Sequence, residues 1–164
     1  MAKHGNLQQR IIKNISPFFP CKDIDIGNPE MEFSIRLQPF TANFCTIAIE
    51  KFKKVDSIRV VCILYTTPKI QETLKKLTDT EMRDTMEQFN KLYHRQYKTD
   101  YLFAKDYTSI QNMKHLFIQN LSLQSVLDSI YSNIVLAREV VQYLIIMDKS
   151  MESAEIDPNN PMFQ

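Results

Sequence analysis

The sequence predicts an α+β fold, with helices on one face of a largely antiparallel sheet of about five strands. Three observations support this class. Apolar and polar side chains alternate in short segments before residue 66 and again after residue 100, as in strands with one polar face. Apolar residues recur at helical spacing at the N-terminus, in the middle and in a long C-terminal segment. The links between the first three strands are short, which favours antiparallel neighbours.

The N-terminal segment predicts a short amphipathic helix over residues 5–16. Its apolar residues share one face: Leu7, Ile11, Ile12 and Ile15. Pro17 ends the helix, because proline cannot continue the hydrogen-bond ladder. Residues 21–30 are rich in turn formers, so a loop is expected there.

Three strands are predicted next, over residues 31–38, 44–49 and 57–65. In the first, apolar side chains alternate with polar ones, which indicates one face towards solvent. The third is apolar on both faces, as in a central strand of a sheet.

Two helix starts follow in the middle of the chain. Thr67 suits an N-cap and Pro68 suits the first helical position. Thr78 and Glu81 then match a capping box. We therefore expect two helices, or one helix broken near Thr78.

The second half of the chain predicts two strands, at residues 101–104 and 113–118, with residues 107–114 open to either a strand or a helix. One helix is expected from about residue 122 to 148, roughly 40 Å long. Residues 1–149 are expected to form a single domain, and residues 150–164 an extended polar tail.

Composition excludes several classes of function. The 20 basic and 19 acidic residues give a net charge of +1, so there is no general attraction to nucleic acid or anionic membrane. With only two glycines, no glycine-rich phosphate-binding loop exists. The three histidines and three cysteines form no metal-ligand pattern. We expect no cofactor, no metal and no enzymatic activity.

The cysteines and the chain termini predict a location. Cys21, Cys45 and Cys62 are odd in number and form no CxxC pair, which suits reduced, buried thiols in a reducing compartment. No signal peptide and no long apolar run is evident. A cytoplasmic protein without a membrane span is therefore expected.

Two surfaces are candidates for binding. The end of the long helix is apolar around more than one stripe, which predicts a partner or dimer interface unless these residues pack on their own sheet. The residues concerned are Val140, Val141, Leu144, Ile146 and Met147. A cluster of basic and aromatic residues could bind single-stranded nucleic acid by charge and stacking. It contains Lys91, Tyr93, Arg95, Tyr97 and Lys98. A second basic group, Lys51, Lys53 and Lys54, falls in a predicted hairpin link.

The sequence Leu-Ser-Leu-Gln-Ser-Val-Leu-Asp-Ser-Ile at residues 121–130 resembles the start of the closing helix in an uncharacterised archaeal domain family. That family has a type III secretion chaperone-like fold, and the order of elements is similar over nearly the whole chain. The resemblance implies an α+β protein without catalytic residues. Secretion chaperones of this fold are small dimers that hold an unfolded stretch of a client. They are usually acidic, whereas this chain is not.

Together these features predict a non-catalytic protein-interaction module, chaperone-like or an accessory subunit, that binds a protein partner or a second copy through an apolar sheet or helix surface. The alternative is a nucleic-acid- or ribosome-associated protein that uses the cluster at residues 91–98. On the first hypothesis, Val140→Asp or Ile146→Asp is expected to break association before it breaks folding.

Overall fold

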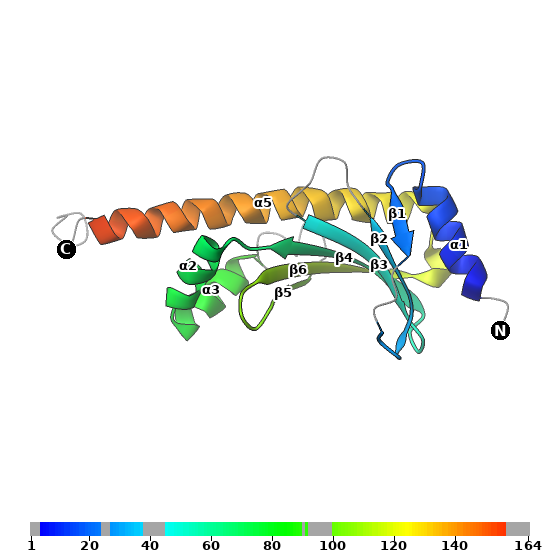
Figure 1. The fold of residues 1–164 in the computed structure, drawn as a ribbon, viewed down its shortest axis with the longest axis horizontal. Helices are drawn as coiled ribbons and strands as arrows, with labels where there is room; N and C mark the ends of the chain where they lie inside the picture. The colour runs from blue at the N-terminus through cyan, green and yellow to red at the C-terminus, as the bar shows by residue number, and fades with distance from the viewer. Residues whose placement is uncertain (1–3, 24–26, 38–44, 90, 92–99, 157–164) are drawn as a thin grey trace.

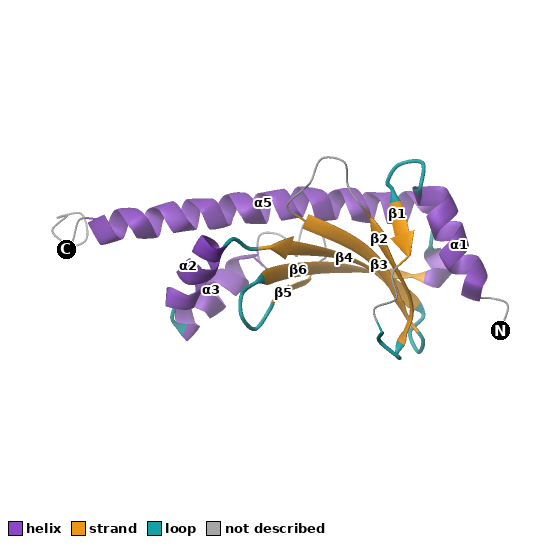
Figure 2. Cartoon of the chain, in the orientation of Figure 1, coloured by secondary structure: helices purple, strands orange, loops and turns teal. Residues whose placement is uncertain are grey.

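One antiparallel sheet organises the fold, in the strand order β1-β2-β3-β4-β6-β5. The computed structural model describes residues 4–23, 27–37, 45–89, 91 and 100–156. Figure 1 shows the arrangement and Figure 2 the helices and strands. The strands are β1 (Cys21–Asp23), β2 (Met31–Leu37), β3 (Cys45–Phe52), β4 (Ser57–Tyr65), β5 (Asp100–Phe103) and β6 (Ser109–Phe117). The helices are α1 (His4–Ile15), α2 (Pro68–Lys76), α3 (Asp79–Phe89) and α5 (Leu123–Ile156), with a short 3₁₀ turn, η2 (Ile118–Asn120).

Helix α5 runs along one face of the sheet, and α1 packs near its N-terminal end (Figure 1). We call this face of the sheet the covered face. Its side chains alternate along β2, β3, β4 and β6 and meet the inner side of α5. In register, Ile35 lies opposite Ile49, and Ile49 lies opposite Val60. All three side chains are fully buried, so this face forms the hydrophobic core.

The predicted α+β class and its order of elements are confirmed. The break between the middle helices is also confirmed. Glu81 accepts hydrogen bonds from the backbone N–H and the hydroxyl of Thr78, both at 2.8 Å, and its own N–H donates to the Thr78 hydroxyl at 3.3 Å. This is a reciprocal capping box that begins α3.

Two expectations were wrong in detail, and one segment that the sequence left open is now assigned. Residues 21–23 pair with β2 and add a sixth, short edge strand, which is too short to show alternation in the sequence. The open segment 107–114 is mostly strand, because β6 begins at Ser109 and pairs with β4 over its whole length. The expected tail does not begin at residue 150, because α5 continues to Ile156. Residues 150–156 contain no proline or glycine, and the first helix breaker is Pro158.

Candidate protein-interaction surfaces

The partner-binding residues predicted on α5 fall on different sides of the helix. Val140 and Leu144 are 0% and 2% exposed and belong to the hydrophobic core. Val141 and Met147 are half-buried at the edge of that core. Of the five, Ile146 alone is well exposed, at 66%. The prediction was therefore wrong for Val140 and Leu144, because α5 buries these two residues in the hydrophobic core of the protein.

The outer side of α5 carries several exposed apolar side chains between polar ones. They are Leu123, Tyr131, Val135, Ile145 and Ile146. The Tyr131 ring also contacts Phe19, with the ring centroids 5.5 Å apart. Arg138, Glu139 and Gln142 are exposed among them. This side of α5 is therefore amphipathic, with apolar side chains exposed among charged and polar ones.

The segment Leu123–Lys149 of α5 is also long and apolar enough to cross a membrane, judged by length and composition alone. About a third of its most apolar window is buried inside the protein. The core helix of a soluble protein satisfies the same two conditions. In this structure the inner side of the segment contacts β3, β4 and β6.

Helix α2 is fixed to the C-terminal half of α5 by polar contacts. The Asp148 carboxylate accepts a hydrogen bond from the Thr73 hydroxyl at 2.7 Å and pairs with the Lys69 ammonium at 2.9 Å. The Lys69 ammonium and then the Thr73 hydroxyl hold the pKa of Asp148 below its usual range. The Tyr143 hydroxyl also donates to Gln88 of α3 at 2.9 Å. These contacts hold the middle helices beneath α5 where it extends past the sheet (Figure 1).

The second face of the sheet is formed by the alternate residues of the same strands, and we call it the open face. No described helix lies across this face in Figure 1. One row across it runs Arg36–Ala48–Val61–Met113 in strand register. Small side chains such as Ala48 are buried near its centre, whereas large apolar ones stand exposed at its two ends. These are Tyr65, 61% exposed, and Phe117, 62% exposed.

A hollow of about 270 Å³ lies at the Phe117 end of the open face. Its lining residues are Phe52, Val55, Ser57, Arg59 and His115, and Phe117 lies opposite Ser57 in register. The Arg59 guanidinium lies 4.4 Å from the centre of the Phe52 ring and pairs with Glu50 at 2.6 Å. The arginine is therefore held by a cation–π contact and an ion pair. The surface that lines the hollow is mainly apolar.

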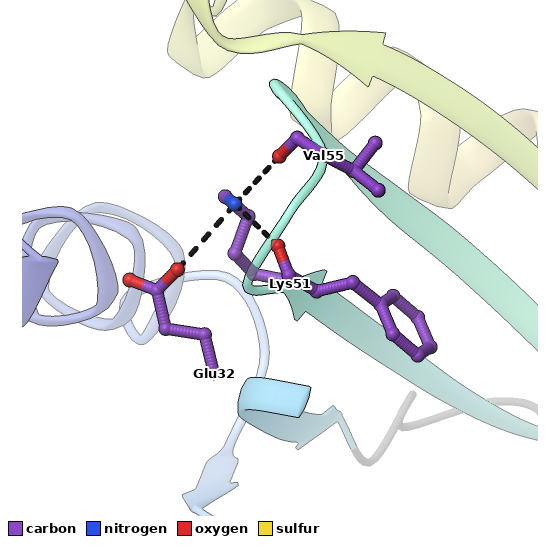
Figure 3. Close-up of polar contacts among 4 residues, drawn as sticks. Glu32, Lys51 and Val55 are labelled. Carbon is purple, nitrogen blue, oxygen red and sulfur yellow. Dashed lines mark hydrogen bonds and ion pairs between the residues drawn. The ribbon is translucent and has the colours of Figure 1, made fainter. Parts of the chain in front are cut away.

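The turn beside this hollow is held by a buried lysine (Figure 3). The Lys51 ammonium donates to the carbonyls of Phe52 and Val55 at 2.5 and 2.6 Å, and lies 3.4 Å from a Glu32 oxygen. Lys51 is only 3% exposed. Lys53 donates to the Pro29 carbonyl at 2.5 Å, and Lys54 lies 3.8 Å from Glu30. Lys51 and Lys53 are thus engaged in structural contacts, whereas Lys54 is exposed beside Glu30.

Most of the second basic cluster lies outside the described residues. This part comprises Tyr93, Arg95, Tyr97 and Lys98. Lys91 is described and exposed, and its ammonium pairs with Glu87 at 2.6 Å. Nucleic-acid binding through residues 91–98 stays a prediction.

No group of three or more histidine, cysteine or acidic side chains converges as a metal site within the described part of the chain. Cys21, Cys45 and Cys62 are free thiols, and the last two are buried. The absence of enzymatic activity stays a prediction.

The covered sheet, the long closing helix and the order of elements define an α+β protein, and two solved structures share this fold. The crystal structure of an uncharacterized protein from Methanothermobacter thermautotrophicus matches with a TM-score of 0.63 and 14% identity, over 86% of this chain and 96% of that one. A chain from the crystal structure of the ExsC–ExsE complex matches with a TM-score of 0.59 and 12% identity, over 84% of this chain and 92% of that one. At these identities the likeness shows the fold alone. No protein-family model matches the sequence, and no curated protein matches it.

Sequence reasoning missed the hollow and the exposed ends of the open face. The signal was present in the alternation of residues 57–65 and 109–117, where Tyr65 and Phe117 are large apolar residues at strand ends. The pairing of β4 with β6, which places Ser57 opposite Phe117, is non-local and has no sequence signature of its own.

Proposed function

We propose that this protein is a non-catalytic, cytoplasmic protein-interaction module that acts as a chaperone-like protein or an accessory subunit. The observation that carries the proposal is the exposure of large apolar side chains outside the core, on the open face and on the outer side of α5. Tyr65, Phe117 and Ile146 are each more than 60% exposed. Aromatic and aliphatic residues exposed in this way are typical anchors of protein interfaces.

The fold supports the same proposal. The second matching structure is of a complex between two proteins, ExsC and ExsE. A sheet with one face covered by its own helix can present the other face to a partner without losing its core. The partner of this chain would be a protein with apolar side chains that fill the hollow or cover the end of the sheet.

A second copy of the chain is one form that this partner could take. Two α5 helices meeting along their outer sides would form a two-fold interface, in which each Ile146 serves both protomers. The mass of the purified protein in solution, measured by light scattering, distinguishes a dimer from a monomer.

The proposal is tested by capture from a native extract with the full chain as bait, with and without nuclease, followed by mass spectrometry. A near-stoichiometric protein that remains after nuclease treatment is the expected result. Capture that depends on RNA and falls steeply with salt would instead support the cluster at residues 91–98, and would contradict the proposal.

A pair of substitutions on α5 makes this test specific. Ile146→Asp places a charge among the exposed apolar residues, and Gln142→Asp places the same charge at an exposed polar position one turn away. If the outer side of α5 contributes to binding, Ile146→Asp reduces partner capture or dimer mass and Gln142→Asp does not. Equal loss in both variants would point to charge alone, and equal retention would exclude this side of α5.

A further inference from the structure

Cys45 and Cys62 are neighbours on the covered face of two adjacent strands. In the register of β3 with β4, Cys45 lies opposite Leu64, and Ile47 lies opposite Cys62. The two cysteines are thus diagonal partners, two residues apart along the ladder. Side chains at this offset on one face of an antiparallel pair can interact. Cys45 is 7% exposed and Cys62 is fully buried, and both are free thiols.

The interaction between the two thiols shifts their pKa values in opposite directions. A hydrogen bond with Cys62 lowers the pKa of Cys45, which favours its thiolate. The same interaction and burial raise the pKa of Cys62, which stays a thiol. The thiolate is the reactive form of cysteine. Cys45 is also the more exposed of the two, at 7% against 0%.

Cys21 provides an internal comparison. It lies on β1, two strands from β3, and its thiol donates to the Phe19 carbonyl at 3.2 Å. Burial raises the pKa of Cys21. Cys21 is more exposed than Cys45, but neither of the other cysteines pairs with it in the register of the sheet.

We propose that Cys45 and Cys62 are a redox modification site, in which a hydroperoxide oxidises Cys45 and Cys62 then closes a disulfide across β3 and β4. In the first step the Cys45 sulfur attacks the terminal peroxide oxygen. An S–O bond forms, the O–O bond breaks, and the leaving alkoxide or hydroxide takes up a proton. In the second step the Cys62 sulfur attacks the Cys45 sulfur, an S–S bond forms, and the hydroxyl leaves as water with the Cys62 proton. In total the two thiols lose two electrons to one peroxide. An organic hydroperoxide yields one alcohol and one water, and hydrogen peroxide yields two waters.

This disulfide is expected to be reversible. Diagonal Cα atoms in antiparallel pairs are about 7–8 Å apart, beyond the usual range of about 4.4–6.8 Å for a disulfide. Closing the bond therefore moves β3 relative to β4 beneath α5. A bond that requires such movement is reduced readily by a dithiol.

The test treats the folded full-length protein with hydrogen peroxide, blocks the remaining thiols with an alkylating agent, and maps the peptides by mass spectrometry. The expected product is a linked Cys45–Cys62 peptide that has lost two hydrogens, with Cys21 alkylated, and dithiothreitol restores the reduced form. Links that involve Cys21, links between two chains, or links that form only after unfolding in urea would overturn the proposal.

Two variants and one native measurement test the order of the steps. Cys62→Ser is expected to stop at a Cys45 sulfenic acid, which dimedone traps, whereas Cys45→Ser is expected to lose peroxide reactivity at the pair. Cys21→Ser serves as the matched control and leaves the linked peptide unchanged. Circular dichroism checks that each variant is folded. In the unmodified protein, alkylation without denaturant is expected to label Cys45 before Cys62, and the reverse order would contradict the proposed roles.

Discussion

Leu64 and Tyr65 are adjacent residues of β4, yet Leu64 is 2% exposed beneath α5 and Tyr65 is 61% exposed on the open face. The two faces of the sheet share the same backbone and hydrogen bonds and differ only in which alternate residues they present. The covered face is a continuous aliphatic core with fully buried Ile35, Ile47, Ile49 and Val60. The open face has small side chains at its centre and large apolar ones at its ends. The difference indicates that the covered face supplies most of the stability of the fold, whereas the open face buries Ala48 and Val61 at its centre and exposes large apolar side chains at its ends.

Helix α5 likewise has a buried side and an exposed side. The largest expected difference in stability is between substitutions on these two sides. Val140→Asp buries a charge in the core and is expected to lower the free energy of unfolding by about 4 kcal/mol or more. Ile146→Asp, at an exposed position, is expected to cost less than about 1 kcal/mol. Urea unfolding of both variants measures the difference. Similar costs would contradict the burial of Val140 in the core. From the sequence we expected Val140→Asp to break association before folding. Because Val140 is buried, we now expect it to destabilise the fold itself.

Lys51 is a buried charged residue on the covered face. Lys51→Met removes the cation that holds the carbonyls of Phe52 and Val55 and pairs with Glu32, and is expected to cost about 3–4 kcal/mol. Lys54→Met is the matched control on the same turn, because Lys54 is 85% exposed at its ion pair, and is expected to cost less than about 0.5 kcal/mol. Chemical denaturation of the two variants gives both values, and a neutral Lys51→Met would contradict its role in holding the turn.

The contrast between the two faces is sharpest within β4. Leu64→Ala is expected to cost about 3 kcal/mol, because it leaves a cavity beneath α5. Tyr65→Ala is expected to cost less than about 1 kcal/mol. Thermal unfolding followed by circular dichroism compares the two. If Tyr65→Ala were as costly as Leu64→Ala, the end of the open face would be part of the core.

The smallest expected effect concerns the contact of α2 with α5. The pKa of Asp148 is lower in the folded protein than in the unfolded chain, so its contribution to stability is present above the usual carboxyl pKa. That contribution is lost as the pH falls through the lower, folded value. Melting temperatures measured from about pH 6 down to about pH 3 are expected to fall more steeply for the wild type than for Asp148→Asn. Parallel pH profiles would show that Asp148 is not a stabilising partner of Lys69 and Thr73.

Local signals predicted much of the fold. The apolar character of both faces of residues 57–65 predicted a central strand, and the spacing of Thr78 and Glu81 predicted the helix break. The orientation of α5 was not predictable, because apolar residues lie all round residues 140–147 and only packing decides that Val140 faces inward and Ile146 outward. The hollow beside Ser57 depends on the non-local pairing of β4 with β6. The register of β3 with β4 likewise brings Cys45 close to Cys62.

Binding of a protein partner by the open face is tested most directly with Phe117→Asp, a substitution at the exposed end of that face. The stability of the variant and its capture of the partner are measured together. After nuclease treatment, the captured partner protein is quantified by mass spectrometry for the wild type and the variant, and the urea midpoint of each is measured in parallel. We expect a urea midpoint close to that of the wild type and a clear loss of the captured partner. Undiminished capture, or loss of capture only together with unfolding, would contradict the claim that the open face binds a protein partner.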